Sequence, residues 1–382
     1  MFAAAVAILT AIIWLVLLLG RGFYWLSGVR DDERLPAPER WPSVVAVVPA
    51  RNEAAVIGDS VGSLLRQDYP GQLAVVVVDD DSSDGTAAAA QAAAQGSQRQ
   101  LVVFKGQPLP AGWTGKLWAL KQGIAAAEQA APDMLLLTDA DIAHRPDSLT
   151  WLVAKAAKDK TVLTSFMAKL RCESLAERSH VPAFIYFFEM LYPFAWVRQP
   201  EARTAAAAGG CVLVRRSALA AAGGFAAVRD AVIDDVAVAR VVARAGGRLW
   251  LGLADEVRSV RPYPRLADLW SMVARSAYTQ LRHSPLVLAG TMAGLLLVYV
   301  GPPVTCLAGL ATGSTAAAVA GGVAWLLMTA SYLPQVRYAR QPVALSLTLP
   351  IAAVLYLLMT VDSARRHHLG RGAAWKGRAA VG

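Results

Sequence analysis

Charged residues and cysteines are both scarce in this chain. Only 17% of its 382 residues are charged and 55% are hydrophobic, whereas about 25% of an ordinary soluble domain is charged. This composition excludes a disordered chain and disfavours a purely soluble protein, because so much apolar side chain needs a very large core or lipid. The three cysteines have no metal-like spacing, which excludes a disulfide-rich scaffold and indicates a reducing compartment without structural zinc: Cys172, Cys211 and Cys306.

Lysine is also rare, so most of the net charge of +9 comes from arginine. The arginines do not form a basic run interleaved with aromatic residues, which disfavours a nucleic-acid partner. The densest basic clusters instead flank apolar stretches, where cations face anionic lipid headgroups: Arg365, Arg366, Arg371, Lys376 and Arg378. We therefore expect a membrane partner and no nucleic acid.

An uncharged apolar run, Phe2 to Leu19, lies at the N-terminal end. At about 1.5 Å per residue it can cross most of a hydrocarbon layer about 30 Å thick. It lacks the preceding basic region and the small-residue cleavage site of a signal peptide, and Arg21 and Arg30 follow it. We predict an uncleaved anchor over residues 1–22 with its C-terminal side in the cytoplasm.

Three further apolar segments follow residue 285: Leu286 to about Leu310, Ala316 to Leu333 and Val343 to Val361. They predict two or three spans over residues 285–363, followed by a basic tail over 364–382. Three full spans would export that tail, against the positive-inside tendency. Pro302, Pro303 and Pro350 are compatible with a kinked or re-entrant element instead, so the number of spans stays open.

Between the apolar regions, short strands alternate with amphipathic helices. β-Branched runs at 44–48 and 75–78 are followed by polar loops and helical spacing, and a third strand fits 101–104. This order predicts an α/β fold with a mostly parallel, Rossmann-like sheet over residues 41–262, whose ligands bind beyond the carboxyl ends of the strands. Residues 263–284 carry an apolar stripe beside cations, which predicts an amphipathic helix at the membrane surface.

The polar loop after the second strand contains consecutive aspartates. Adjacent carboxylates repel one another unless they meet donors or a cation, so we interpret Asp79 and Asp80 as ligand-binding residues suited to a uracil imide or ribose hydroxyls. Asp84 is better placed to cap the following helix. Farther on, Lys116 follows a glycine-rich turn at a predicted helix start, a place suited to phosphate although a solvated helix start is an alternative.

A fourth apolar strand, 134–138, ends in Asp139-Ala140-Asp141. Alternate residues of an extended segment point the same way, about 7 Å apart, so the carboxylates of Asp139 and Asp141 can share one divalent cation. Such an ion can bridge a diphosphate and neutralise it as a leaving group.

Four segments in this order resemble the family 2 inverting glycosyltransferases of GT-A fold: Val47–Glu53, Gln67–Pro70, Asp79–Thr86 and Asp139–Asp141. Within that family, two further segments are most similar to the hopene-associated glycosyltransferases of bacterial hopanoid synthesis: Gly115–Ala119 and Trp375–Arg378. The resemblance implies Mg²⁺ or Mn²⁺ on a sugar diphosphate at Asp139 and Asp141. It also implies a nucleoside site formed by Pro49, Arg51, Glu53, Asp79 and Asp80.

The resemblance also suggests a general base. Gly209–Leu213 resembles the acceptor-side strand of the family, and Asp234-Asp235 stands where the family has a Glu-Asp pair whose second member is the base. Inversion needs one carboxylate to take the proton of the acceptor hydroxyl, and Asp235 is our candidate. Asp234 is an alternative cap for the helix that follows, and because the first acid is Asp rather than Glu, the assignment within the pair stays open.

Processive relatives carry Q-x-x-R-W downstream, but here no Trp follows an arginine in the segment Arg275–Arg282. This favours a single transfer. Arg275, Gln280 and Arg282 are candidates to touch the diphosphate or acceptor, and a purely interfacial helix is the alternative.

The leading hypothesis is a multi-pass enzyme of the bacterial inner membrane with its catalytic domain in the cytoplasm. It would transfer a sugar from a nucleotide sugar, expected to be UDP-linked, to a lipid hydroxyl, and the resemblance implies a hopanoid or related polyisoprenoid. The alternatives are a polyprenyl-phosphate glycosyltransferase and a non-catalytic nucleotide-sugar-binding subunit of a lipid-synthesis complex.

Overall fold

The structure, a computed structural model, describes residues 1–199, 204–370 and 375–376, which divide into two compact units. The helical unit contains Met1–Gly28, Cys172–Ala195 and residues 263–370. The sheet unit contains Val29–Arg171, the described residues of Trp196–Pro262, and residues 375–376. Each unit has its own hydrophobic core.

The sheet unit is built on one eight-stranded sheet with the order β3-β2-β1-β4-β7-β6-β8-β5. The neighbours β3-β2-β1-β4 are all parallel, whereas β7 is antiparallel to both β4 and β6. The predicted α/β fold with a mostly parallel sheet is confirmed, and the four predicted strands are found with ends shifted by at most one or two residues. The strands are β1 (Val44–Ala50), β2 (Leu73–Asp79), β3 (Gln100–Lys105), β4 (Met134–Thr138), β5 (Ile142–Ala143), β6 (Leu163–Lys169), β7 (Cys211–Arg215) and β8 (Leu249–Ser259).

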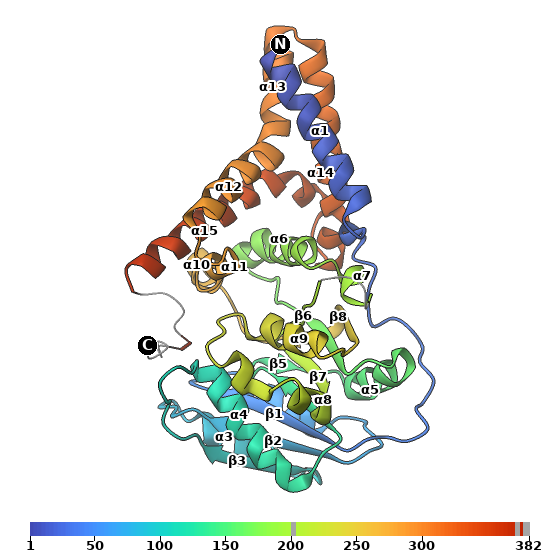
Figure 1. Cartoon of the computed structure of the whole chain (residues 1–382), viewed down its shortest axis with the longest axis vertical. Coiled ribbons are helices and arrows are strands. Elements are labelled where there is room, and N and C mark those ends of the chain that lie inside the picture. The colour runs from blue at the N-terminus through green and yellow to red at the C-terminus, as the bar shows by residue number, and fades with distance from the viewer. Residues whose placement is uncertain (200–203, 371–374, 377–382) are drawn as a thin grey trace. The chain divides into compact units, whose positions relative to one another are not determined.

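Helices pack on this sheet (Figure 1). They are α2 (Ile57–Leu65), α3 (Thr86–Ala92), α4 (Gly115–Ala127), α5 (Ser148–Asp159), α8 (Arg216–Ala221) and α9 (Asp234–Arg244), with 3₁₀ turns at Glu128–Ala130 and Gly224–Val228. α4 packs closely on β1 and β2 because Gly123 has no side chain. A Cβ at this position would lie 2.4 Å from Cγ1 of Val47. This close packing fixes the start of α4, with Lys116, beside the strand ends.

The helical unit contains α1 (Phe2–Gly20), α6 (Leu175–Leu191), α10 (Leu266–Ala274), α11 (Ala277–Gln280), α12 (Pro285–Leu295), α13 (Gly301–Thr312), α14 (Thr315–Tyr338) and α15 (Leu349–His368). The short α7 (Phe194–Val197) lies where the chain leaves this unit. A π turn, Leu296–Val300, joins α12 to α13, and Gly313, with a φ of 70°, closes the turn to α14. α1, α13 and α14 pack side by side, whereas α15 packs on α10, α11 and α12 (Figure 1).

Four helical segments are long and apolar enough to cross a membrane: Phe2–Gly20, Pro285–Thr312, Thr315–Tyr338 and Val343–His368. The predicted N-terminal segment is therefore found. Where the sequence predicts two or three C-terminal spans, the structure has three helical segments that could cross a membrane. Residues 263–284 do not form the single predicted helix. Instead, α10 ends before Arg275 and α11 begins at Ala277, so the apolar stripe is divided between two short helices.

Candidate active site

Three polar loops meet at one edge of the sheet because β1, β2 and β4 are adjacent and parallel. Ala50 at the end of β1 lies opposite Asp79 at the end of β2, and the N–H of Asp80 donates to the carbonyl of Ala50 at 2.8 Å. β4 flanks β1 on its other side and leads directly to Asp139. The structure thus places the predicted nucleoside loops and the predicted metal carboxylates at the same edge. Pro49 differs from the other predicted residues because its side chain is apolar, and it lies buried within β1.

The first two loops are joined by polar contacts. Nη1 of Arg51 donates to the carbonyl of Asp80 and lies 3.7 Å from its Oδ2, and Asp80 is only 1% exposed. Asp79 accepts from the N–H of Ser82 at 2.9 Å. These contacts hold Arg51 and both aspartates at the strand ends, where the sequence predicts the nucleoside.

The prediction that Asp84 caps the following helix is wrong. The N-cap of α3 is Gly85, in the left-handed region with a φ of 88°, rather than Asp84. The Asp84 carboxylate still accepts from the first-turn N–H of Thr86 at 3.1 Å and from the N–H of Ala54 at 3.0 Å. It therefore ties the start of α3 to the loop that follows β1.

Arg261 is a residue of this site that the sequence did not reveal. Its guanidinium forms ion pairs with Oε2 of Glu53 and, at 2.8 Å, with Oδ2 of Asp141. It reaches them because β8 pairs with β5, which leaves the N–H of Val260 donating to the carbonyl of Asp141 at 2.8 Å. Arg261 thus connects the predicted nucleoside loop to the predicted metal site. The available signal was its position just after an apolar strand, although nothing local identifies its partners.

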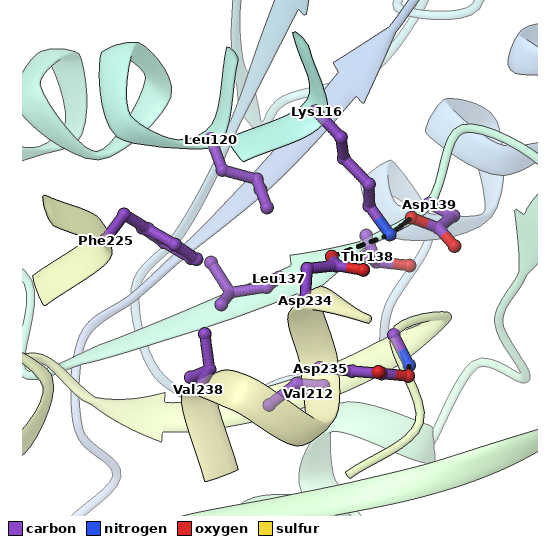
Figure 2. A pocket seen from close by; sticks show the side chains of 11 residues that line it. Lys116, Leu120, Leu137, Thr138, Asp139, Val212, Phe225, Asp234, Asp235 and Val238 are labelled. Atoms are coloured by element: carbon purple, nitrogen blue, oxygen red, sulfur yellow. Dashed lines mark hydrogen bonds and ion pairs between the residues drawn. The ribbon is translucent and has the colours of Figure 1, made fainter. Parts of the chain in front are cut away.

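Lys116 connects Asp139, a predicted metal carboxylate, to the pair of aspartates on α9 (Figure 2). Its Nζ lies 2.7 Å from Oδ1 of Asp139 and 3.1 Å from Oδ2 of Asp234. Burial alone would lower the pKa of Lys116, but Asp139, Asp234 and Asp235 together raise it above its ordinary value. Lys116 therefore stays protonated and balances this group of carboxylates.

Asp235 lies at the start of α9 and is held by two backbone donors. The N–H of Gly209 donates to its Oδ2 at 2.7 Å and the N–H of Val236 to its Oδ1 at 2.7 Å. Burial and the nearby charge of Asp234 raise the pKa of Asp235 to about 7, although Lys116 acts in the opposite direction. A carboxylate with such a pKa is suited to exchange a proton near neutral pH.

The alternative in which Asp234 caps the helix is wrong. Asp234 is the first residue of α9, the N-cap is Ile233, and no side chain forms a capping hydrogen bond there. The carboxylate of Asp234 instead faces Lys116. An acidic residue in the first turn is still favourable because the helix N-terminus carries a partial positive charge.

The predicted metal carboxylates are suited to a hard divalent cation. Burial raises the pKa of Asp139, the charges of Asp141 and Asp234 raise it further, and Lys116 opposes them. A cation would relieve this repulsion. In residues 1–199, 204–370 and 375–376 no three His, Cys, Asp or Glu side chains are grouped as a metal site. In proteins, Mg²⁺ is commonly held by one or two carboxylates, with substrate phosphates and water completing its shell.

A small pocket brings these groups together (Figure 2). Its polar side carries Lys116, Asp139, Asp234 and Asp235, while its apolar wall is formed by Leu120, Leu137, Val212, Phe225 and Val238. Apolar walls strengthen the electrostatic interactions of the charged groups beside them.

The structure does not place Arg275, Gln280 and Arg282 in this site. They belong to the helical unit, where Gln280 accepts from the hydroxyl of Tyr192 at 2.8 Å and Arg282 adopts a φ of 54°. Their contact with diphosphate or acceptor stays a prediction.

Comparison with known proteins identifies the family. Residues 42–279 match the family described as "Glycosyltransferase like family 2". The mannosyltransferase PcManGT from Pyrobaculum calidifontis, solved in complex with GDP-Man and Mn²⁺, has a similar fold, with a TM-score of 0.57, 22% identity, and coverage of 93% of this chain and 99% of that one. Glucosyl-3-phosphoglycerate synthase from Mycobacterium tuberculosis, solved with Mg²⁺ and uridine-diphosphate, is 19% identical with a TM-score of 0.40, over 63% of this chain and 79% of that one. A search of the curated proteins finds no match. The match over residues 42–279 shows that this chain belongs to the family 2 glycosyltransferases.

Proposed function

We propose that this chain is an inverting, metal-dependent glycosyltransferase that transfers a single sugar from a nucleotide sugar to a lipid hydroxyl. The observation that carries the proposal is the position of Lys116, whose ammonium joins Asp139 on the donor side to Asp234 beside the candidate base. Asp139, proposed for the leaving-group side, and Asp235, the proposed base, both line one pocket, which supports the proposal. Family membership and the GDP-Man and Mn²⁺ in PcManGT support a nucleotide-sugar donor and a metal.

The side chains of this pocket are suited to a direct displacement. The Asp235 carboxylate takes the proton of the acceptor hydroxyl while that oxygen bonds to the anomeric carbon from the face opposite the diphosphate. The bond from the anomeric carbon to the diphosphate oxygen breaks, and its electron pair leaves with the nucleoside diphosphate. Asp139 and Asp141 would hold Mg²⁺ or Mn²⁺, which when bound neutralises that leaving group. Lys116 and Arg261 keep the surrounding carboxylates in place.

The lipid acceptor is supported by the four candidate membrane helices, since an enzyme anchored in a bilayer meets lipids there. We expect a hopanoid or related polyisoprenoid because of the resemblance of the Gly115–Ala119 segment. The expected donor is UDP-linked, with GDP as the alternative, and the proposed location is the bacterial inner membrane with the sheet unit in the cytoplasm.

The test is Asp235→Asn, with the exposed Asp230→Asn as the matched control. Membranes containing each variant are incubated with labelled nucleotide sugars, and the lipids are extracted and counted. Loss of a general base should lower transfer about 10²- to 10⁴-fold without changing nucleotide affinity, and the control should match the wild type. Transfer by Asp235→Asn within a few-fold of wild type would contradict the base and favour a phosphate acceptor. A wild type that labels no lipid from any donor would favour the non-catalytic subunit.

A further inference from the structure

The end of the chain contacts the first loop of the sheet unit. Nζ of Lys376 lies 3.0 Å from Oε1 of Glu53 and 3.4 Å from the carbonyl of Asn52. Nε of Arg51 in turn donates to the carbonyl of Lys376 at 3.2 Å. The sequence predicts that Lys376 faces lipid headgroups as part of a basic tail, but its ammonium has a carboxylate of the sheet unit as its partner.

Trp375 covers a second part of the same edge. A Cβ at Gly115 would lie 2.8 Å from Cε3 of Trp375 and 3.7 Å from Oδ2 of Asp80. The indole ring thus packs against the bare backbone where α4 begins, beside the buried aspartate at the end of β2. Only glycine leaves room for this contact, and the next residue is Lys116.

Lys376 is also linked to the candidate metal carboxylates through a chain of ion pairs. Glu53 is only 7% exposed and its two oxygens have different cationic partners: Lys376 on Oε1 and Arg261 on Oε2. Arg261 continues to Asp141. Among the described residues, removal of Lys376 would leave Glu53 with Arg261 as its ion-pair partner. Removing one partner of a buried ion pair is destabilising because it leaves buried charge uncompensated.

We propose that Trp375 and Lys376 are positioning residues of the donor site, which hold the nucleoside-diphosphate end in its binding geometry. Lys376 fixes Glu53 and Arg51, and Trp375 fixes the backbone at Gly115, where α4 begins. Lys376 therefore contacts the loop after β1, and Trp375 lies against the glycine that begins α4, directly before Lys116. This inference rests on the proposed function, because it assumes that these loops bind a nucleoside diphosphate.

The experiment measures nucleotide binding by calorimetry on the purified full-length protein in detergent, with UDP and with GDP, each in the presence of Mn²⁺. Lys376→Ala and Trp375→Ala should each weaken the preferred nucleotide about tenfold, an effect of about 1.4 kcal/mol. Lys376→Arg should retain affinity within about threefold. The matched control is Arg40→Ala, which removes an exposed cation paired with Asp133 at 3.2 Å in the same unit, and it should bind as the wild type does.

A double-mutant cycle with Glu53→Gln separates positioning from general loss of structure. If Lys376 acts through Glu53, adding Lys376→Ala to the Glu53→Gln variant should cost less than about twofold, whereas independent effects would add. In transfer assays the single variants should raise the KM for the donor more than they lower kcat.

Two results would overturn this inference and leave the proposed function intact. One is that Lys376→Ala and Trp375→Ala bind the nucleotide within about twofold of wild type. The other is that the effects of Lys376→Ala and Glu53→Gln are strictly additive. A wild-type protein that binds neither nucleotide would overturn the donor site itself and this inference with it. If an alanine variant fails to fold, Trp375→Phe and Lys376→Met provide the same comparison with smaller changes.

Discussion

The two units of this protein both bury polar groups, but they satisfy them in different ways. In the helical unit, the hydroxyls of Tyr24, Tyr186 and Ser331 form a continuous hydrogen-bonded series at 2.9 and 2.8 Å. In the same unit, the carboxylate of Glu189 accepts hydrogen bonds from Ser27 at 2.9 Å and from Gln335. In the sheet unit, the carboxylates of the site lie beside a pocket and are balanced by Lys116 and Arg261.

This difference distinguishes a structural network from a candidate active site. The helical-unit groups are neutral hydroxyls and amides with a single carboxylate, and they connect helices distant in the sequence. In the sheet unit the carboxylates of Asp139, Asp141, Asp234 and Asp235 outnumber the two cations that face them, Lys116 and Arg261. The excess negative charge is costly unless a ligand or a further cation offsets it. Carboxylates with shifted pKa values beside a pocket are a recognised mark of function. Such carboxylates occur at the edge of the sheet.

Removing a candidate metal carboxylate should have a larger effect on transfer than a change of pH or a change in the helical unit. Asp139→Ala and Asp141→Ala should each lower transfer at least about 100-fold, because the departing diphosphate would lose its cation. Calorimetry of the nucleotide with and without Mn²⁺ should show that Mn²⁺ strengthens binding to the wild type and not to the variants. Asp59→Asn, on the exposed face of α2, is the control. A variant that retains the full Mn²⁺ effect would remove its aspartate from the proposed metal site.

Lowering the pH should reduce transfer less than removing a metal carboxylate does, and the group responsible, Asp235, lies in the same unit. Burial and the charge of Asp234 raise the pKa of Asp235 to about 7, and a base works only when it is deprotonated. The rate should therefore fall as the pH drops below about 7, approaching tenfold per pH unit. Asp234→Asn removes one cause of the raised pKa, so the midpoint of this acidic limb should move to lower pH. An unchanged midpoint would show that another group titrates.

The sequence predicts those parts of the site that are local in the chain. Asp79, Asp80 and Asp139 each stand at or just after the end of an apolar strand, and parallel strands bring such ends to one edge. Arg261 and Lys376 could not be assigned in this way, because their partners are distant: 120 residues separate Arg261 from Asp141, and 325 separate Lys376 from Arg51. Long-range ion pairs leave no periodic pattern.

The smallest effect on transfer should come from the buried network of the helical unit, and it completes the comparison. Glu189→Ala removes the acceptor to which Ser27 and Gln335 donate, and burying donors without an acceptor costs about 1–3 kcal/mol. The melting temperature in detergent should fall by several degrees, while kcat of the folded enzyme stays within about twofold of wild type. Glu128→Gln, at an exposed position of the sheet unit, should change neither value. A large loss of kcat in Glu189→Ala at unchanged stability would mean that this network also takes part in the reaction, because a purely structural network acts on turnover only through the fraction of folded protein.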